Sequence, residues 1–99
     1  MEITITQTDG KSLIEIPGSF DVMTSPHMKK ALNEAVSAAD EVELDFSKTE
    51  LVTSAGLRVL LQAQKSVQAL GKSMTMKNIS PDVMEVFDMT GVTNIFTIL

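Results

Sequence analysis

The sequence predicts an α/β domain with a mixed sheet of four to five strands and helices packed on it. Two observations lead to this fold class. The chain opens with two strand-like runs around Asp9-Gly10, a turn signal typical of an antiparallel hairpin because both residues tolerate positive φ. Helical and strand-like patterns then alternate to the end of the chain, as in sheets whose parallel strands are joined by right-handed crossovers. The hairpin makes the predicted sheet mixed.

The first half of the chain predicts two strands, a helix and a third strand. The hairpin strands are placed at residues 3–6 and 13–16, where apolar and polar side chains alternate. Ser25-Pro26 predicts a helix start, with Ser25 as N-cap and Pro26 at the first helical position. The apolar residues at helical spacing after it are Met28, Leu32, Ala35, Val36 and Ala39. Residues 42–46 alternate again and predict the third strand.

The second half predicts a helix, a strand, a helix and a short last strand. The first of these helices is indicated by Leu57, Leu60, Leu61, Gln64 and Val67, and Gly71 is placed just after its end. Residues 74–77 predict a strand whose methionines, Met74 and Met76, belong to the core. Ser80-Pro81 predicts the N-cap of the last helix, Gly91 its end, and residues 95–99 a final strand.

Composition favours one domain over residues 1–99 and excludes several functions. The 99 residues carry 13 Asp and Glu against 8 Lys and Arg, and the longest basic run is Lys29-Lys30. Without a basic patch, Trp or Tyr, we expect no nucleic acid binding and no attachment to anionic membranes. No apolar stretch approaches the roughly 20 residues of a membrane span, and no leader pattern is visible, so we expect a cytoplasmic protein without membrane insertion.

No pattern in the sequence predicts an enzyme or a cofactor site. Cysteine is absent and His27 is the only histidine, which removes the usual metal ligand sets and thiol chemistry. No serine lies in a Gly-x-Ser-x-Gly motif, and the five glycines are scattered rather than gathered in a phosphate-binding loop. Met23 and Met89 do not fit the core pattern and are candidates for partner contacts. We therefore expect a regulatory or binding domain.

One local feature suggests a chemical switch. Thr53 and Ser54 lie where a connection meets the start of the second helix. One interpretation is that Ser54 or Thr53 is only an N-cap, which typically stabilises a helix by about 1 kcal/mol. A phosphate on Ser54 would also be well placed, because helix N-termini offer unpaired N–H groups and positive potential to anions. The added charge of roughly −1.5 to −2 could then change partner binding without refolding the domain.

Three segments resemble the STAS family, which is named for sulphate transporters and anti-sigma factor antagonists. They are Gly18-Ser19-Phe20-Asp21, residues 45–61 with the motif Thr53-Ser54-Ala55-Gly56-Leu57, and residues 79–91. The resemblance spans nearly the whole chain and agrees with the predicted order of strands and helices. It implies the STAS fold and a single-domain anti-sigma factor antagonist.

The resemblance also implies a mechanism. In the family, the unphosphorylated antagonist binds an anti-sigma factor, commonly a serine kinase, and so frees a sigma factor. The kinase then phosphorylates a serine at the start of the second helix, which breaks the complex, and a phosphatase resets it. That serine corresponds to Ser54, and Asp21 matches a family position near the phosphorylated loop.

The motif departs from the best-known members, which have Asp-Ser-Ser/Thr-Gly-Leu. Thr53 replaces the acid and Ala55 replaces the second hydroxyl, while the acceptor Ser54 is retained. The residues predicted to contact the partner are Asp21, Met23, Thr53, Ser54, Ala55, Gly56 and Arg58. Gly56 is expected to permit either a close backbone approach or a tight turn. The alternative function is a cytoplasmic STAS subunit of a transporter, such as a lipid ABC system, in which Ser54 would be only a cap.

Overall fold

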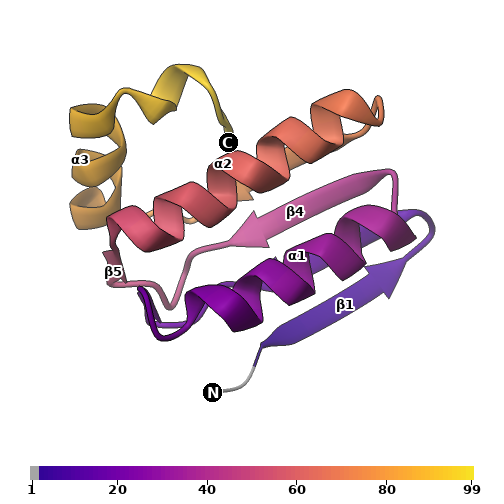
Figure 1. The fold of residues 1–99 in the computed structure, drawn as a ribbon, viewed down its shortest axis with the longest axis horizontal. Helices are drawn as coiled ribbons and strands as arrows, with labels where there is room; N and C mark the ends of the chain where they lie inside the picture. Colours follow the sequence, from indigo (N-terminus) through magenta and orange to yellow (C-terminus); the bar gives the residue numbers. More distant parts are fainter. Residues whose placement is uncertain (1–2) are drawn as a thin grey trace.

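Residues 3–99, the part of the chain that the computed structural model describes, form a five-stranded mixed sheet (Figure 1). The strands are β1 (Thr4–Thr8), β2 (Lys11–Glu15), β4 (Glu41–Asp45), β6 (Ser73–Lys77) and β7 (Thr97–Ile98), and this is also their order across the sheet. Only β1 is antiparallel to its neighbour; the other pairs are parallel. The predicted α/β class and mixed sheet are therefore confirmed.

The β1–β2 hairpin turns at Asp9-Gly10, as the sequence predicts. Both residues have positive φ, 41° at Asp9 and 81° at Gly10, and Thr8 faces Lys11 across the turn. This is the left-handed geometry that a two-residue hairpin turn requires. The strands are shifted slightly toward the turn relative to the prediction, so that the turn is tighter than the hydrophobic pattern alone indicated.

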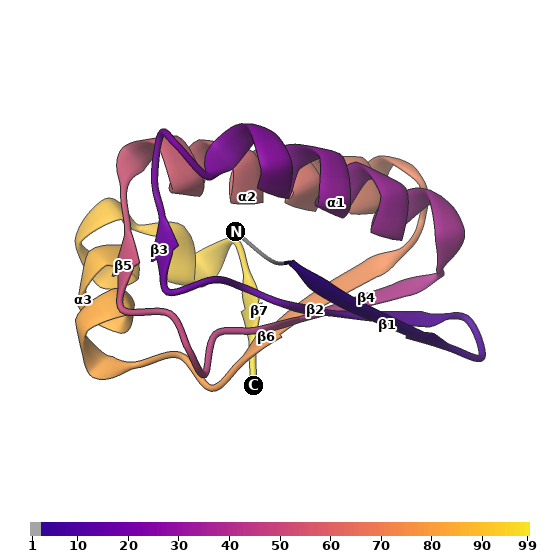
Figure 2. The same cartoon turned by 90° about the horizontal axis from the view of Figure 1, so that it is seen from below.

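Helices α1 (Ser25–Ala38) and α2 (Ser54–Ala69) lie side by side on the same face of the sheet (Figure 2). Each buries an apolar stripe against the core side of the strands; the stripe of α2 includes Leu57, Leu60 and Val67. The core side of β6 is made by Met74 and Met76, as predicted. Because both helices connect parallel strands, their N-termini lie at one end of the sheet (Figure 1).

The predicted N-cap of α1 is wrong. The N-cap position is occupied by Thr24, and Ser25 is the first helical residue. The Ser25 backbone N–H already donates to the Asp21 carbonyl at 2.9 Å, and its hydroxyl donates to the same oxygen at 2.6 Å. A hydrogen-bonded turn therefore precedes the helix, and Ser25 stabilises that turn instead of capping the helix.

A second, two-stranded sheet was not predicted. Strands β3 (Ser19–Phe20) and β5 (Leu51–Val52) pair in parallel at the end of the molecule where α1 and α2 begin (Figure 2). Each strand has only two residues, which is too short for an alternating pattern to be recognised in the sequence. The pair fixes the two segments that lead into the helices relative to one another.

Helix α3 (Pro81–Thr90) packs at the same end of the sheet, next to β5, and the predicted signals at both of its ends are confirmed. The Ser80 hydroxyl accepts a hydrogen bond from the Val83 N–H at 3.3 Å, and Gly91 ends the helix with φ 77°. The 3-10 turn η1 (Val92–Asn94) follows, so the last strand is shorter than the predicted residues 95–99. The rings of Phe46 and Phe87 pack edge to face with centroids 6.1 Å apart.

Candidate functional site

Ser54 is exposed at the start of α2, where the sequence places the candidate switch. Thr53 occupies the N-cap position with an extended backbone, but neither hydroxyl makes a cap hydrogen bond. The Thr53 hydroxyl donates instead to the Phe20 carbonyl at 3.4 Å. The Ser54 side chain is thus available at the surface and contributes little to holding the helix.

Gly56 holds the first turn of α2 against β3. A Cβ atom at this position would lie only 2.5 Å from the Phe20 carbonyl oxygen and 2.9 Å from the Phe20 ring. The same carbonyl accepts the Thr53 N–H at 2.9 Å. Of the two roles expected for Gly56, the structure has the close backbone approach. Gly56 itself is buried, whereas the partner contact predicted for it would need an exposed residue.

Asp21 organises the loop between β3 and α1. Its carboxylate Oδ1 accepts the backbone N–H groups of Met23 at 2.9 Å and Thr24 at 3.1 Å. The Asp21 N–H in turn donates to the Thr24 hydroxyl at 2.9 Å. An aspartate whose carboxylate accepts hydrogen bonds from the backbone N–H groups two and three residues later is typical of a turn. This arrangement leaves Val22 and Met23 exposed by 71% and 78% at the surface.

An open groove of about 340 Å³ lies between the first turns of α1 and α2. Its lining from the α1 side is Val22, Ser25, Pro26 and Lys29, and from α2 Ala55, Arg58, Val59 and Gln62. Ala55 and Arg58 were among the predicted partner residues. The other six lining residues were not predicted, because the position of a groove between two helices depends on how the helices pack against each other. In the sequence, Lys29 stands out only as part of the basic run Lys29-Lys30.

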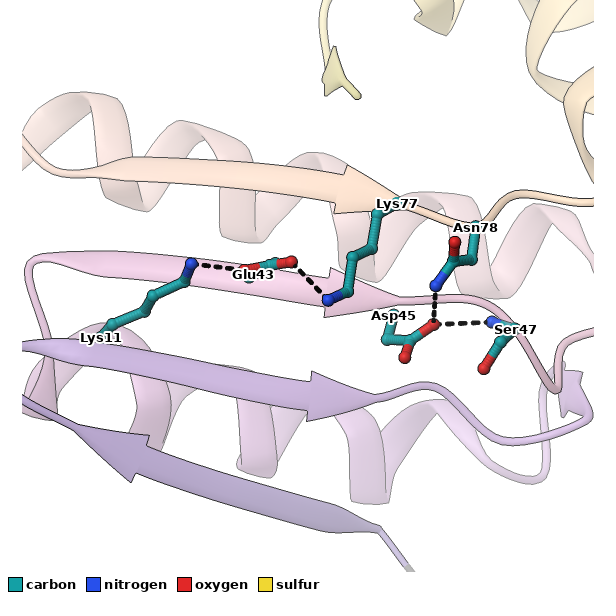
Figure 3. A network of polar contacts seen from close by, with 6 residues as sticks. All are labelled: Lys11, Glu43, Asp45, Ser47, Lys77 and Asn78. Atoms are coloured by element: carbon teal, nitrogen blue, oxygen red, sulfur yellow. Dashed lines mark hydrogen bonds and ion pairs between the residues drawn. The ribbon is translucent and has the colours of Figure 1, made fainter.

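A separate polar cluster lies on the sheet face that α1 and α2 leave uncovered (Figure 3). Glu43 accepts ion pairs from Lys11 at 2.6 Å and from Lys77 at 2.8 Å. These charged hydrogen bonds hold the pKa of Glu43 below its ordinary value of 4.5, although burial acts in the opposite direction. Glu43 in turn raises the pKa of Lys77. The cluster ties β2, β4 and β6 together.

Asp45 extends this cluster toward the end of β4. Burial raises the pKa of the Asp45 carboxyl, but hydrogen bonds outweigh it and leave the pKa below its ordinary value. The Asn78 side-chain amide donates to Oδ1 at 3.1 Å, and the Ser47 backbone N–H donates to the same oxygen at 2.9 Å (Figure 3). Each acid of the cluster is already satisfied by structural partners, which is typical of a stabilising network and not of an acid–base pair.

Two further observations concern the described residues 3–99. No three His, Cys, Asp or Glu side chains gather there in a way that would hold a metal ion. None of the helices in that part of the chain has the length and apolar character needed to cross a bilayer.

Comparison with known proteins decides the family. A family model described as "Mlab, STAS domain" matches residues 3–99. The chain belongs to the STAS family. The STAS domain is similar to the anti-sigma-B factor antagonist of Bacillus subtilis strain 168, with 24% identity over 98 residues that cover 99% of this chain and 90% of the relative. It is also 24% identical to the anti-sigma F factor antagonist of Paenibacillus polymyxa over 100 residues, covering 99% of this chain and 86% of that protein.

Solved structures confirm the STAS fold. The unphosphorylated form of the anti-sigma factor antagonist SpoIIAA superposes with a TM-score of 0.83 at 17% identity, over 99% of this chain and 88% of that one. An anti-sigma factor antagonist from Mycobacterium paratuberculosis superposes with a TM-score of 0.87 at 20% identity, over 98% of this chain and 83% of that one. A sulfate transporter family protein from Wolinella succinogenes superposes with a TM-score of 0.76 at 17% identity, over 87% of this chain and 71% of that one. The same fold thus occurs in both classes of protein for which the family is named.

Proposed function

We propose that this STAS domain is an anti-sigma factor antagonist, a non-enzymatic switch that releases its anti-sigma factor when Ser54 is phosphorylated. The main support for the proposal is that the Ser54 side chain is exposed and free to be modified. It is exposed at the first residue of α2 and is not used as a cap. The relatives named as anti-sigma factor antagonists align over nearly the whole chain, which supports the role.

The surroundings of Ser54 suit a switch that acts through surface charge. The exposed loop residues Val22 and Met23 lie at the same end of the molecule, where β3 pairs with β5. A phosphate on Ser54 would add roughly −1.5 to −2 charges to this surface. The free N–H groups at the start of α2 favour such a charge, so the phosphorylated domain stays folded while its surface changes. The switch would operate in the cytoplasm, with a serine kinase as partner and a phosphatase to reverse it.

A kinase assay tests the proposal directly. The purified chain is incubated with ATP and each candidate anti-sigma factor kinase of the source organism, and the modified residue is located by mass spectrometry. We expect one phosphate on Ser54. The Ser54→Ala variant should take none, whereas Ser37→Ala, which removes another exposed serine, should be modified like the wild type. A phosphate on a different residue, or none from any of these kinases, would contradict the proposal.

A binding assay tests the consequence of the modification. Ser54→Glu should weaken binding to the same anti-sigma factor roughly tenfold or more, and Ser54→Ala should keep it. Treatment of the phosphorylated chain with a phosphatase should restore the complex. Equal affinity of the Ser54→Glu variant and the wild type would mean that the serine does not control binding.

The second candidate is a cytoplasmic subunit of a transporter, such as a lipid ABC system. It is favoured by the likeness in fold to the sulfate transporter family protein of Wolinella succinogenes. In that case neighbouring genes should encode a permease and an ATPase, not a kinase and a phosphatase. The chain should then copurify with the transporter, and Ser54→Glu should leave that complex intact.

A further inference from the structure

The groove between α1 and α2 contains two cations that have no acidic partner within the described residues. Lys29 and Arg58 line it from opposite helices, and neither makes an ion pair with any of residues 3–99. No Asp or Glu stands three or four residues from either of them along its helix. Two cations therefore face one groove in a chain whose net charge is −5.

The acid of the loop before α1, Asp21, makes no ion pair with either cation. Asp21 precedes Val22, which lines the groove, but its Oδ1 accepts the N–H groups of Met23 and Thr24. Besides the two cations the lining includes apolar side chains, among them Val22, Pro26 and Val59. A surface of this kind matches an extended or helical segment that brings an apolar side chain flanked by carboxylates.

Ser54 and Arg58 are one helical turn apart and both are exposed. Side chains four residues apart on a helix lie on the same face and can pair. A phosphate on Ser54 can therefore reach the Arg58 guanidinium, whose fork of N–H groups suits phosphate oxygens. The same arginine is then no longer free to bind a carboxylate in the groove.

We propose that the groove binds an acidic segment of the anti-sigma factor through Lys29 and Arg58, and that phosphorylated Ser54 competes for Arg58. This inference rests on the proposed function and names the chemistry of its partner. Phosphorylation would break the complex in two ways: it withdraws one cation from the groove, and it places a negative charge beside the partner's carboxylates. The second effect follows from like-charge repulsion at an interface.

Binding to the anti-sigma factor that phosphorylates Ser54 tests the docking surface. Lys29→Gln and Arg58→Gln should each weaken binding of the unphosphorylated chain by about tenfold, and the loss should shrink at high salt. Lys30→Gln is the matched control, because this neighbouring exposed lysine does not line the groove and should bind like the wild type. Circular dichroism checks that each variant is folded.

Phosphorus NMR tests the competition without the partner. In the chain phosphorylated on Ser54, Arg58→Gln should raise the second pKa of the phosphate by about 0.3 of a pH unit, and Lys30→Gln should leave it unchanged. An unaltered phosphate pKa in Arg58→Gln would overturn the competition.

The outcomes separate the inference from the function on which it rests. If phosphorylation breaks the complex but Lys29→Gln and Arg58→Gln bind normally, the groove is not the docking site and the proposed function stands. If the wild-type chain binds no anti-sigma factor, the proposed function fails and this inference fails with it.

Discussion

At the scale of single residues, Gly56 is a position where the fold leaves no room for a side chain. An alanine Cβ would lie 2.5 Å from the Phe20 carbonyl oxygen, a backbone atom that also accepts the Thr53 N–H. Phe20 is fully buried, so it cannot move away without breaking the β3–β5 pair. We expect Gly56→Ala to lower the free energy of unfolding by about 3 kcal/mol, measured by urea denaturation.

Gly71→Ala is the matched control for this prediction. Gly71 has φ 69°, but no heavy atom lies within 4 Å of the position of an added Cβ. Gly71→Ala should therefore lower the free energy of unfolding by about 1 kcal/mol, which comes only from the left-handed backbone conformation. If Gly56→Ala proves no more destabilising than Gly71→Ala, the close approach of Phe20 is not what requires glycine there.

The difference between these glycines explains how far the sequence could predict residue roles. Gly10, Gly71 and Gly91 follow runs whose local pattern already predicts a turn or a helix end, and their positive φ values agree. At position 56 glycine is needed because Phe20 leaves no room for a Cβ atom. Phe20 is distant in the sequence and is brought next to Gly56 by the pairing of the two short strands, which was not predicted. No local pattern contains that information.

At the scale of elements, α2 and α3 begin in different ways. Ser80 caps α3 through its hydroxyl, whereas Thr53 and Ser54 leave the first N–H groups of α2 without a side-chain cap. We expect Ser80→Ala to lower the free energy of unfolding by about 1 kcal/mol, and Ser54→Ala to change it by less than about 0.5 kcal/mol. Urea denaturation of both variants measures the difference. A loss of 1 kcal/mol or more in Ser54→Ala would mean that this serine is mainly structural.

The elements also limit what the sequence could say about the site. The helix start at Ser54 was predictable, because an apolar helical pattern follows it directly. The groove was not, since its two cations come from different helices and meet only when α1 packs beside α2. The first turn of α1 was misplaced for a similar reason: Ser25 resembles an N-cap in the sequence, but Asp21 builds a turn ahead of it.

At the scale of the whole molecule, strand register creates the polar cluster on the uncovered sheet face. Glu43 lies opposite Leu13 in β2 and Thr75 in β6. Lys11 precedes Leu13 by two residues and Lys77 follows Thr75 by two, so both lie on the same face as Glu43 and flank it from opposite sides (Figure 3). A shift of either register by one residue would turn one lysine away, which is why the cluster could not be predicted from sequence alone.

The cluster makes part of the stability depend on pH. The pKa of Glu43 is lower in the folded protein than its ordinary value of 4.5, so the folded state favours the ionised form. Its contribution is fully present above pH 4.5 and is lost as the pH falls through the lowered pKa. Replacing Glu43 by Gln removes both ion pairs, so we expect Glu43→Gln to be less stable than the wild type by about 1 kcal/mol at pH 7.

Denaturation across pH 7 to pH 3 measures this dependence. The stability difference between the wild type and Glu43→Gln should narrow toward pH 3, because protonation neutralises the wild-type carboxyl. Glu41→Gln is the matched control: this acid is on the same strand but is exposed and makes none of the ion pairs of the cluster. Its stability should run parallel to that of the wild type. If the stability difference between the wild type and Glu43→Gln stays constant from pH 7 to pH 3, packing of the side chain, and not its charge, stabilises the three strands.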